Sequence, residues 1–263
     1  MAISRPQVIS TPAAPAIRDP RFGVVAGFTQ ICNTAPVGWR RPMLSMLARL
    51  GITRYRDFPQ MELIRETENS PYTFDREDPA GLSGRMDQLH GLNAELGLEV
   101  LDCFVGTPSW NRPNVSSGSE WNRFNGDGRR WGFPRDLGAT SDSYAAVAAH
   151  WGDTELGIEA WNEEDSVSAL PADQYAVLMK AMRHGLDQAA ANDSANGLAP
   201  VVPLVCGAFT DAVHTAYLNS LCDNQLATVC DAVSYHSYTD AFNVQDDAGR
   251  IVLWANACAV SEG

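Results

Sequence analysis

Short apolar runs typical of buried strands alternate with segments of helical periodicity along almost the whole of this 263-residue chain. The seven runs cover residues 22–28, 52–58, 99–105, 156–161, 201–205, 232–235 and 258–260. The clearest helical segment places Tyr175, Leu178, Met182 and Leu186 on one face, at spacings of three and four residues. Such alternation predicts a parallel α/β sheet with right-handed crossovers, which both a doubly wound sheet and a (β/α)8 TIM barrel satisfy.

The residues that follow the apolar runs favour the barrel. No run is followed by a G-x-G-x-x-G or a G-x-x-x-x-G-K-[ST] loop, which argues against a dinucleotide fold and a P-loop fold. Polar and aromatic side chains come at the ends of the runs or soon after them instead: Arg56, Asp57, Trp110, Asn162, Glu163, His236, Tyr238 and Glu262. In a barrel they all lie on the carboxyl face, where the active sites of barrel enzymes are found.

The expected domain organisation is simple. We expect a flexible, Pro/Ala-rich lead-in over residues 1–20 and one (β/α) barrel domain over residues 21–263. The sequence ends one residue after Glu262, whereas an eighth strand with its crossover requires about 30 more residues. We therefore expect a TIM barrel truncated at its C-terminal side after strand seven, with the edges of the first and seventh strands exposed.

Charge and cysteine content narrow the classes of partner. The chain has 19 Lys and Arg against 32 Asp and Glu, and its net charge of −13 would repel the phosphate backbone of a nucleic acid. No apolar run approaches the roughly 18–20 residues of a membrane span, so no membrane partner is expected.

The six cysteines form no C-x-x-C pair, which predicts no zinc or dithiol redox site, although Cys222 and Cys230 could form a disulfide. The lead-in lacks the apolar core of a signal peptide, which favours the cytoplasm unless an upstream segment has been removed.

The most specific local motif is Ile-Glu-Ala-Trp-Asn-Glu-Glu at residues 158–164, where a buried strand runs directly into Asn162 and Glu163. A carboxyl group at a strand end beside a tryptophan is partly desolvated, and desolvation raises its pKa. A raised pKa suits a general acid that works at neutral pH. The same residues could equally begin a loop or cap a helix, and Glu164 is the rival acid if the register differs by one residue.

Weaker signals follow other strands. His236 and Tyr238 alternate after the sixth run and so point the same way on an extended segment, although a structural histidine is the commoner outcome. Arg56 and Asp57 leave the second run together, where a salt bridge on the barrel rim is the simpler interpretation. Trp110 lies at the start of a long loop rich in Trp, Asn and Arg. This tryptophan either contacts the flat face of a sugar ring or pins the loop to the barrel.

Taken in order, the segments RYRDF, YTFD, TPSW, GFPRDL, IEAWNEE, SYHSY and VSEG resemble the retaining glycoside hydrolases of clan A. The likeness is nearest to the (β/α)8 enzymes of families 39 and 5, and it covers roughly residues 22–263. It implies hydrolysis of a β-linked oligo- or polysaccharide by double displacement, with no cofactor and no metal ion. In retaining enzymes of this kind two carboxyl groups lie about 5–5.5 Å apart across the reacting bond.

The resemblance also implies roles for particular residues. Glu163 corresponds to the acid/base at the end of the fourth strand, and Glu262 to the nucleophile at the end of the seventh. Asn162 would hold the sugar 2-hydroxyl, and Arg56 would keep the nucleophile ionised. The other expected sugar contacts are His236, Tyr238 and Trp110.

Two further functions remain open on the sequence. An inactive or fragmentary barrel of the same kind would bind carbohydrate without cleaving it. An unrelated hydrolase or metal enzyme could use His236 with Asp57 and Glu163, although no two of these residues share a metal-binding motif.

Overall fold

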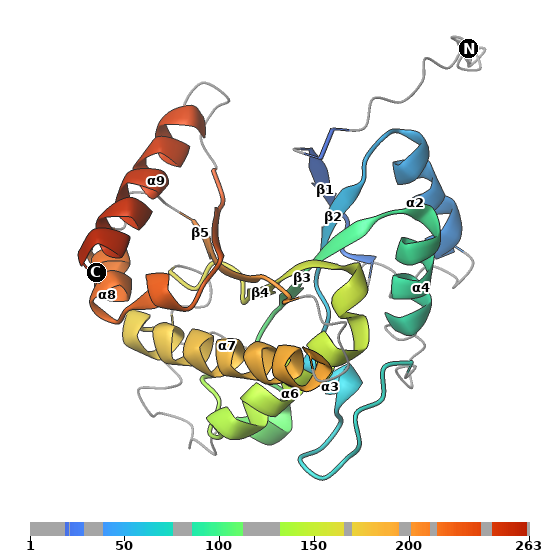
Figure 1. The fold of residues 1–263 in the computed structure, drawn as a ribbon, viewed down its shortest axis with the longest axis horizontal. Coiled ribbons are helices and arrows are strands. Elements are labelled where there is room, and N and C mark those ends of the chain that lie inside the picture. Colours follow the sequence, from blue (N-terminus) through green and yellow to red (C-terminus); the bar gives the residue numbers. More distant parts are fainter. Residues whose placement is uncertain are drawn as a thin grey trace, which may run out of the picture.

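The computed structural model describes residues 19–20, 22–28, 39–75, 86–112, 132–165, 170–194, 201–210, 215–237 and 244–261. Its centre is a sheet of six parallel strands: β1 (Gly23–Val25), β2 (Arg54–Asp57), β3 (Glu99–Phe104), β4 (Glu155–Ala160), β5 (Leu204–Phe209) and β6 (Ala232–Tyr235). The strands lie side by side in their order along the chain. A doubly wound sheet reverses that order at one point, so the unbroken order identifies barrel-type winding. The result is a curled half-barrel (Figure 1).

The helices lie around the outside of this curl, from α2 and α4 beside β1 and β2 to α8 and α9 beside β5 (Figure 1). Their bounds are α2 (Arg40–Arg49), α3 (Met61–Ile64), α4 (Met86–Leu96), α6 (Leu137–Trp151), α7 (Ala172–Ser194), α8 (Thr215–Asp223) and α9 (Val244–Ser261). The described residues also include the 3-10 turns η2 (Ser109–Asn111) after β3, η3 (Gly152–Thr154) between α6 and β4, and η4 (Leu226–Thr228) between α8 and β6. Within the described residues, no helix combines the length and the apolar character that a membrane span requires.

Local chemistry explains where several helices begin and end. The Asp136 carboxylate caps α6 by accepting a hydrogen bond from the Ala139 amide at 2.9 Å. Gly97 follows the last residue of α4 with a φ of +65°, the left-handed conformation that glycine adopts most readily. These boundaries place β3 directly after α4 and the long loop directly before α6.

The main apolar core lies between the sheet and the outer helices. Its largest buried side chains include Trp161 of the β4 end, Tyr175 of α7 and Phe104 of β3. Helices α6 and α7 approach so closely that a Cβ atom on Gly185 would lie 2.1 Å from the Ser141 carbonyl oxygen. The core therefore fixes β3 and β4, the strands whose ends carry the most specific motif, against two long helices.

The predicted seventh strand is wrong, because residues 258–260 belong to helix α9. Ile251 and Cys258 of this helix are buried, and the Trp254 indole N–H donates to the Leu218 carbonyl of α8 at 2.9 Å. This spacing of three and four residues is helical, so a short apolar run at the helix end was mistaken for a strand. Among the described residues the barrel has six strands, and its edge strands are β1 and β6. The second edge is therefore the sixth strand and not the predicted seventh.

Strand β5 begins and ends later than the predicted run at residues 201–205, because its pairing with β6 continues past an irregularity. Gly207 has a φ of +123°, and a Cβ atom there would lie 2.2 Å from the Ser234 carbonyl oxygen. The following residue, Ala208, also has a positive φ of 58°. The two strands resume pairing at Phe209 and Tyr235.

The cysteine pairing also differs from the one considered on the sequence. Cys222 of α8 is bonded to Cys258 of α9, whereas Cys230 is not part of a disulfide. Cys230 lies near the end of η4, where its thiol donates to the Leu226 carbonyl at 3.3 Å. The disulfide therefore joins the last two described helices, because residues 36 apart in sequence meet when α9 packs on α8.

Candidate active site

Four of the predicted polar residues, Arg56, Asn162, Glu163 and His236, contact one another in pairs at the carboxyl ends of the strands. Arg56 of β2 donates from Nη2 to the Asn162 side-chain oxygen at 3.1 Å. Its Nε donates to Glu159 of β4 at 2.5 Å, and its guanidinium lies 4.6 Å from the centre of the Phe58 ring. The Arg56 side chain is only 12% exposed, so these charge-assisted bonds form in a largely desolvated place. Arg56 and Asn162 are thus brought together, as expected for one site.

Glu163 and His236 also meet, although they follow the ends of two different strands, β4 and β6. The Nδ1 atom of His236 lies 2.8 Å from Oε1 of Glu163, and Glu163 is buried. The backbone N–H of His236 donates to the Phe209 carbonyl at 2.7 Å, which fixes the ring at the end of the sheet. The histidine therefore orients the carboxyl group that the sequence motif singled out.

The backbone at the carboxyl ends of β4 and β5 is strained. The described chain has four non-glycine residues with positive φ, and three of them are Trp161, Glu163 and Ala208. Such conformations cost about 1–3 kcal/mol each and persist where the surrounding structure fixes them, typically at functional sites. The positive φ angles of Trp161 and Glu163 change the direction of the backbone just after β4 ends.

Sequence reasoning missed the inner partner of Arg56. Glu159 is 1% exposed, and besides Arg56 it accepts a hydrogen bond from the Ser234 hydroxyl of β6. Burial raises the pKa of the neighbouring Cys103 thiol, and the negative charge of Glu159 raises it further. The protonated thiol donates to the Trp161 carbonyl at 2.9 Å. Alternation along β4 places Glu159 on one face of the strand, but it does not identify Arg56 or Ser234 as partners.

A pocket of about 220 Å³ opens at the carboxyl ends of β2 and β3 and reaches Asn162. Its lining mixes apolar, polar and charged side chains, among them Phe58, Gln60, Met61, Glu62, Thr107, Arg112 and Asn162. It is smaller than the roughly 300–1,000 Å³ of a typical ligand pocket. It therefore suits one unit of a larger ligand rather than the whole of it.

The chain shares its fold with a family 39 glycoside hydrolase. That structure, from the gut symbiont Bacteroides cellulosilyticus WH2, has a TM-score of 0.57 and 15% identity over 81% of this chain and 37% of that chain. An exo-β-1,4-mannosidase from Opitutaceae bacterium strain TAV5 has a TM-score of 0.47 and 14% identity, over 95% of this chain and 53% of that one. The catalytic domain of family 30 xylanase C from Talaromyces cellulolyticus has a TM-score of 0.47 and 15% identity, over 82% of this chain and 52% of that one.

This chain thus spans between 37% and 53% of the length of those three structures. No protein-family model matches the sequence, and no curated protein is significantly similar to it. At such low identity the likeness concerns the fold. It confirms the α/β barrel winding that was predicted from the alternation of runs and helical segments.

Glu164, the rival to Glu163, lies in a different environment. It is fully buried, and neither of its carboxyl oxygens has a hydrogen-bond partner among the described residues. Desolvation raises the pKa of this carboxyl well above its usual range. Glu164 therefore faces the interior, while Glu163 meets the histidine of β6.

Trp110 is held by the protein itself. Its indole N–H donates to the Arg65 carbonyl at 2.8 Å, and the Arg65 guanidinium lies 4.9 Å from the ring centre. The next residue, Asn111, donates to the Asp136 carbonyl at 2.9 Å and so ties the two described ends of the long loop together. These contacts agree with a tryptophan that pins the loop, and Trp110 does not line the pocket beside Asn162. Its expected sugar contact stays a prediction.

Other predicted residues are placed apart from this site or lie outside the described chain. Asp57 is buried on the face of β2 opposite Arg56, so the two do not form the expected rim salt bridge with each other. Within the described part of the chain, His236, Asp57 and Glu163 do not converge as ligands of one metal ion. Tyr238 and Glu262 lie outside the described residues, and Glu262 comes directly after Ser261, the last residue of α9.

Proposed function

We propose that this protein is a glycoside hydrolase that cleaves a β-linked oligo- or polysaccharide with retention of configuration. The observation that carries the proposal is the position of Glu163, held just after β4 in a left-handed backbone conformation and hydrogen-bonded to His236, the residue that follows β6. The barrel winding shared with a family 39 glycoside hydrolase supports the same function. So does the clan A order of motifs in the sequence.

Glu163 is the proposed acid/base. In the first step its protonated carboxyl gives a proton to the leaving glycosidic oxygen, and in the second its carboxylate takes a proton from water. His236 keeps the carboxyl in one orientation through the 2.8 Å bond to Oε1. Asn162, whose oxygen is held by Arg56, is the proposed partner of the sugar 2-hydroxyl.

Glu262 is the proposed nucleophile. Its carboxylate would attack the anomeric carbon, expel the aglycone and form a glycosyl ester, which water then hydrolyses. The proposal rests on the order of motifs in the sequence, since residues 258–260 belong to α9 and not to a seventh strand. It requires the Glu262 carboxylate to come within about 5–5.5 Å of Glu163 in the working enzyme. Arg56, which pairs with Glu159 in this structure, is the proposed source of positive charge beside it. Tyr238 and Trp110 are proposed as further sugar contacts.

The test is turnover of a panel of aryl β-glycosides, with the first-formed anomer identified by proton NMR. A retaining hydrolase releases the β-anomer first, and Glu262→Gln abolishes that release. Glu95→Gln, an exposed glutamate of α4, is the matched control and leaves turnover unchanged. Release of the α-anomer first, or full activity in Glu262→Gln, would contradict the proposed mechanism.

The second candidate is a barrel that binds carbohydrate without cleaving it. The pocket beside Asn162 favours it as much as it favours the enzyme, because a pocket alone needs no nucleophile. Isothermal titration with the same glycosides separates the two: a binder shows affinity in wild type and Glu262→Gln and turnover in neither.

The disulfide between Cys222 and Cys258 bears on where the protein works. Disulfides persist mainly in oxidising compartments. We therefore favour the secreted alternative over the cytoplasm, in keeping with a polysaccharide as substrate. Titration of free thiols in protein purified without reductant, expected to find Cys222 and Cys258 oxidised, tests this assignment.

A further inference from the structure

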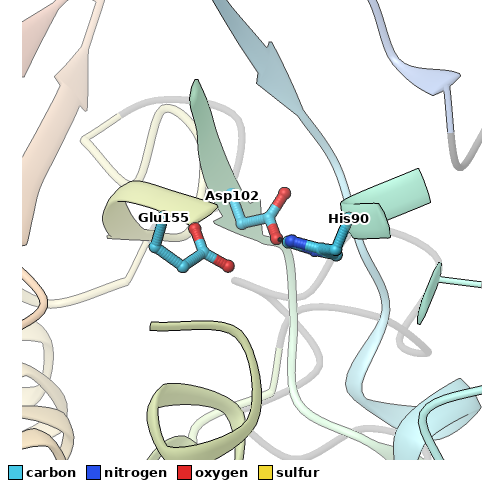
Figure 2. Close-up of side chains that lie close together, drawn as sticks. All are labelled: His90, Asp102 and Glu155. Carbon is cyan, nitrogen blue, oxygen red and sulfur yellow. Dashed lines mark ion pairs between the residues drawn. The ribbon is translucent and has the colours of Figure 1, made fainter. Parts of the chain in front are cut away.

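Three side chains with metal-binding chemistry converge on the helix-facing side of the sheet (Figure 2). They are His90 of α4, Asp102 of β3 and Glu155 at the start of β4, and their ligand atoms all lie within 4.8 Å of one another. His90 is 3% exposed and Asp102 is 1% exposed. Asp102 alternates with the helix-facing core residues Val100 and Phe104, so the cluster lies behind the sheet and not in the candidate active site.

The hydrogen bonds of His90 leave one ring nitrogen ready to bind a cation. The Thr154 hydroxyl donates its proton to the Trp151 carbonyl at 3.1 Å, so it accepts from His90 Nδ1 at 2.7 Å. A neutral imidazole with its proton on Nδ1 presents a lone pair on Nε2. The Trp151 ring stacks on His90 with centres 4.2 Å apart and planes 6° apart, which fixes the direction of that lone pair.

Nε2 of His90 points at an acceptor rather than a donor. It lies 3.4 Å from Oδ2 of Asp102, and neither atom has a hydrogen-bond partner within the described residues. Both carboxyl oxygens of Glu155 are buried and have no partner there either. Three acceptor atoms, one from each residue, thus lie close together in a buried place, an arrangement that is costly unless something positive lies among them.

When both carboxyl groups are ionised, a cation or a bound proton must balance the charges of the cluster. Asp102 and Glu155 together carry two negative charges when ionised. Among the described residues, the basic side chain that pairs with Asp102 is His90. A protonated His90 would offset one of these charges, whereas a divalent ion would offset both and leave His90 neutral. A neutral imidazole is the form in which histidine binds metals.

We propose that His90, Asp102 and Glu155 form a Zn²⁺ site, with Nε2 and one oxygen of each carboxylate as ligands. Zinc bonds to imidazole nitrogen and carboxylate oxygen are about 2.0–2.2 Å, which at a tetrahedral angle separates two ligand atoms by about 3.3–3.5 Å. The His90–Asp102 separation of 3.4 Å matches that value. Mg²⁺ and Ca²⁺ prefer oxygen-only ligand sets, so the imidazole selects zinc over them.

The proposed ion has a structural role. It links α4 to β3 and β4, elements that otherwise meet through the apolar core. Thr154 holds His90 from behind in the way that residues around metal-ligating histidines commonly do. The inference does not depend on the proposed glycosidase activity.

The test uses the full chain after removal of metals with EDTA, titrated with Zn²⁺ alone and followed by calorimetry and elemental analysis. One zinc ion per chain is expected, and at a zinc concentration 100-fold above Kd the melting temperature should rise by about 5–10 °C. Mg²⁺ at the same concentration should leave the melting temperature unchanged. Absence of zinc binding at micromolar concentrations would overturn the proposal.

Variants show whether zinc binds at this cluster. His90→Gln, Asp102→Asn and Glu155→Gln should each weaken zinc binding at least about 100-fold, and Thr154→Val by about 10–100-fold. His184→Gln, an exposed histidine of α7, is the matched control and should bind zinc as wild type does. Zinc binding that survives in all three ligand variants would overturn the proposal. So would a cluster that holds only protons, in which Asp102→Asn and Glu155→Gln alter stability equally with and without zinc.

Discussion

The inner and outer faces of β3 and β4 both bury charged side chains, but they balance the charge in different ways. On the inner face, the Arg56 guanidinium donates to Glu159, and His236 lies within hydrogen-bond distance of Glu163. On the outer face, the carboxyl oxygens of Glu155 have no hydrogen-bond partner among the described residues. The protein's own groups complete the inner network, whereas the outer cluster requires a cation or a proton from solution.

This difference separates two kinds of site. A network whose donors and acceptors already match is organised before a ligand arrives, which is what catalysis by fixed dipoles and charges requires. A cluster of unmatched acceptors is organised by the ligand that it binds, and that binding then contributes to the stability of the fold. The inner face is accordingly the candidate active site, and the outer face the candidate structural metal site.

The largest expected effect is on turnover when the inner network loses its acid. Glu163→Gln keeps the shape of the side chain but cannot transfer a proton, so kcat on an aryl β-glycoside with a poor leaving group should fall by about 10²–10⁴-fold. Glu164→Gln, one residue along, should change kcat less than a few-fold because Glu164 faces the interior. The reverse order of effects would assign the acid to Glu164.

The next effect is on stability and compares two arginines of β2. Arg56→Met leaves Glu159 buried without its cation, which should lower the free energy of unfolding by about 3–5 kcal/mol. Arg54→Met breaks a similar pair with Glu99, but there the side chains are 35% and 50% exposed, so the loss should be at most about 1 kcal/mol. Urea denaturation measures both. Equal losses would show that burial does not distinguish the two pairs.

A smaller effect depends on pH and concerns Glu164. Burial raises its pKa in the folded state, so the folded protein binds this proton more tightly than the unfolded chain does. The contribution to stability is therefore complete below the unfolded pKa, near 4.3, and is lost as the pH rises through the folded pKa. Glu164→Gln removes this loss and should be more stable than wild type by about 1–3 kcal/mol at pH 8. The gap between the two unfolding free energies should close near pH 4, and a gap that does not vary with pH would contradict the assignment.

The smallest effect is expected at an exposed histidine–aspartate pair close to the proposed zinc cluster. His150 and Asp87 lie 2.6 Å apart, but both side chains are 40% exposed. His150→Gln should therefore change the free energy of unfolding by less than about 1 kcal/mol. It should also leave the zinc-dependent rise in melting temperature intact, in contrast to His90→Gln. Loss of that rise in His150→Gln would move the zinc site away from the buried cluster.

Much of the fold follows from local pattern in the sequence. All six described strands lie within or overlap predicted runs, because strands of parallel sheets are mostly continuous apolar segments bounded by glycine and polar residues. The error at residues 258–260 has the same origin, since a short apolar run suits a strand and the end of a buried helix equally well. Only the packing of Trp254 and Cys258 on α8 decides between them.

The candidate site is predictable to the extent that it depends on strand ends. Arg56, Asn162, Glu163 and His236 could be named because parallel strands end at one edge of the sheet. Glu159 could not, because its partners Arg56 and Ser234 are 103 and 75 residues away in sequence. The outer cluster shares this property, since its three ligands come from three separate elements and form no spacing motif.

The central claim is that Glu163 is the acid/base of a retaining glycosidase, and azide competition tests it most directly. Glu163→Ala should hydrolyse 2,4-dinitrophenyl β-glycosides slowly, because this leaving group needs no proton to depart but the glycosyl ester then lacks its base. Added azide, which attacks without a base, should restore the rate and yield a β-glycosyl azide detectable by NMR. An unchanged rate with no azide product, in a variant whose wild-type parent is active, would contradict the claim.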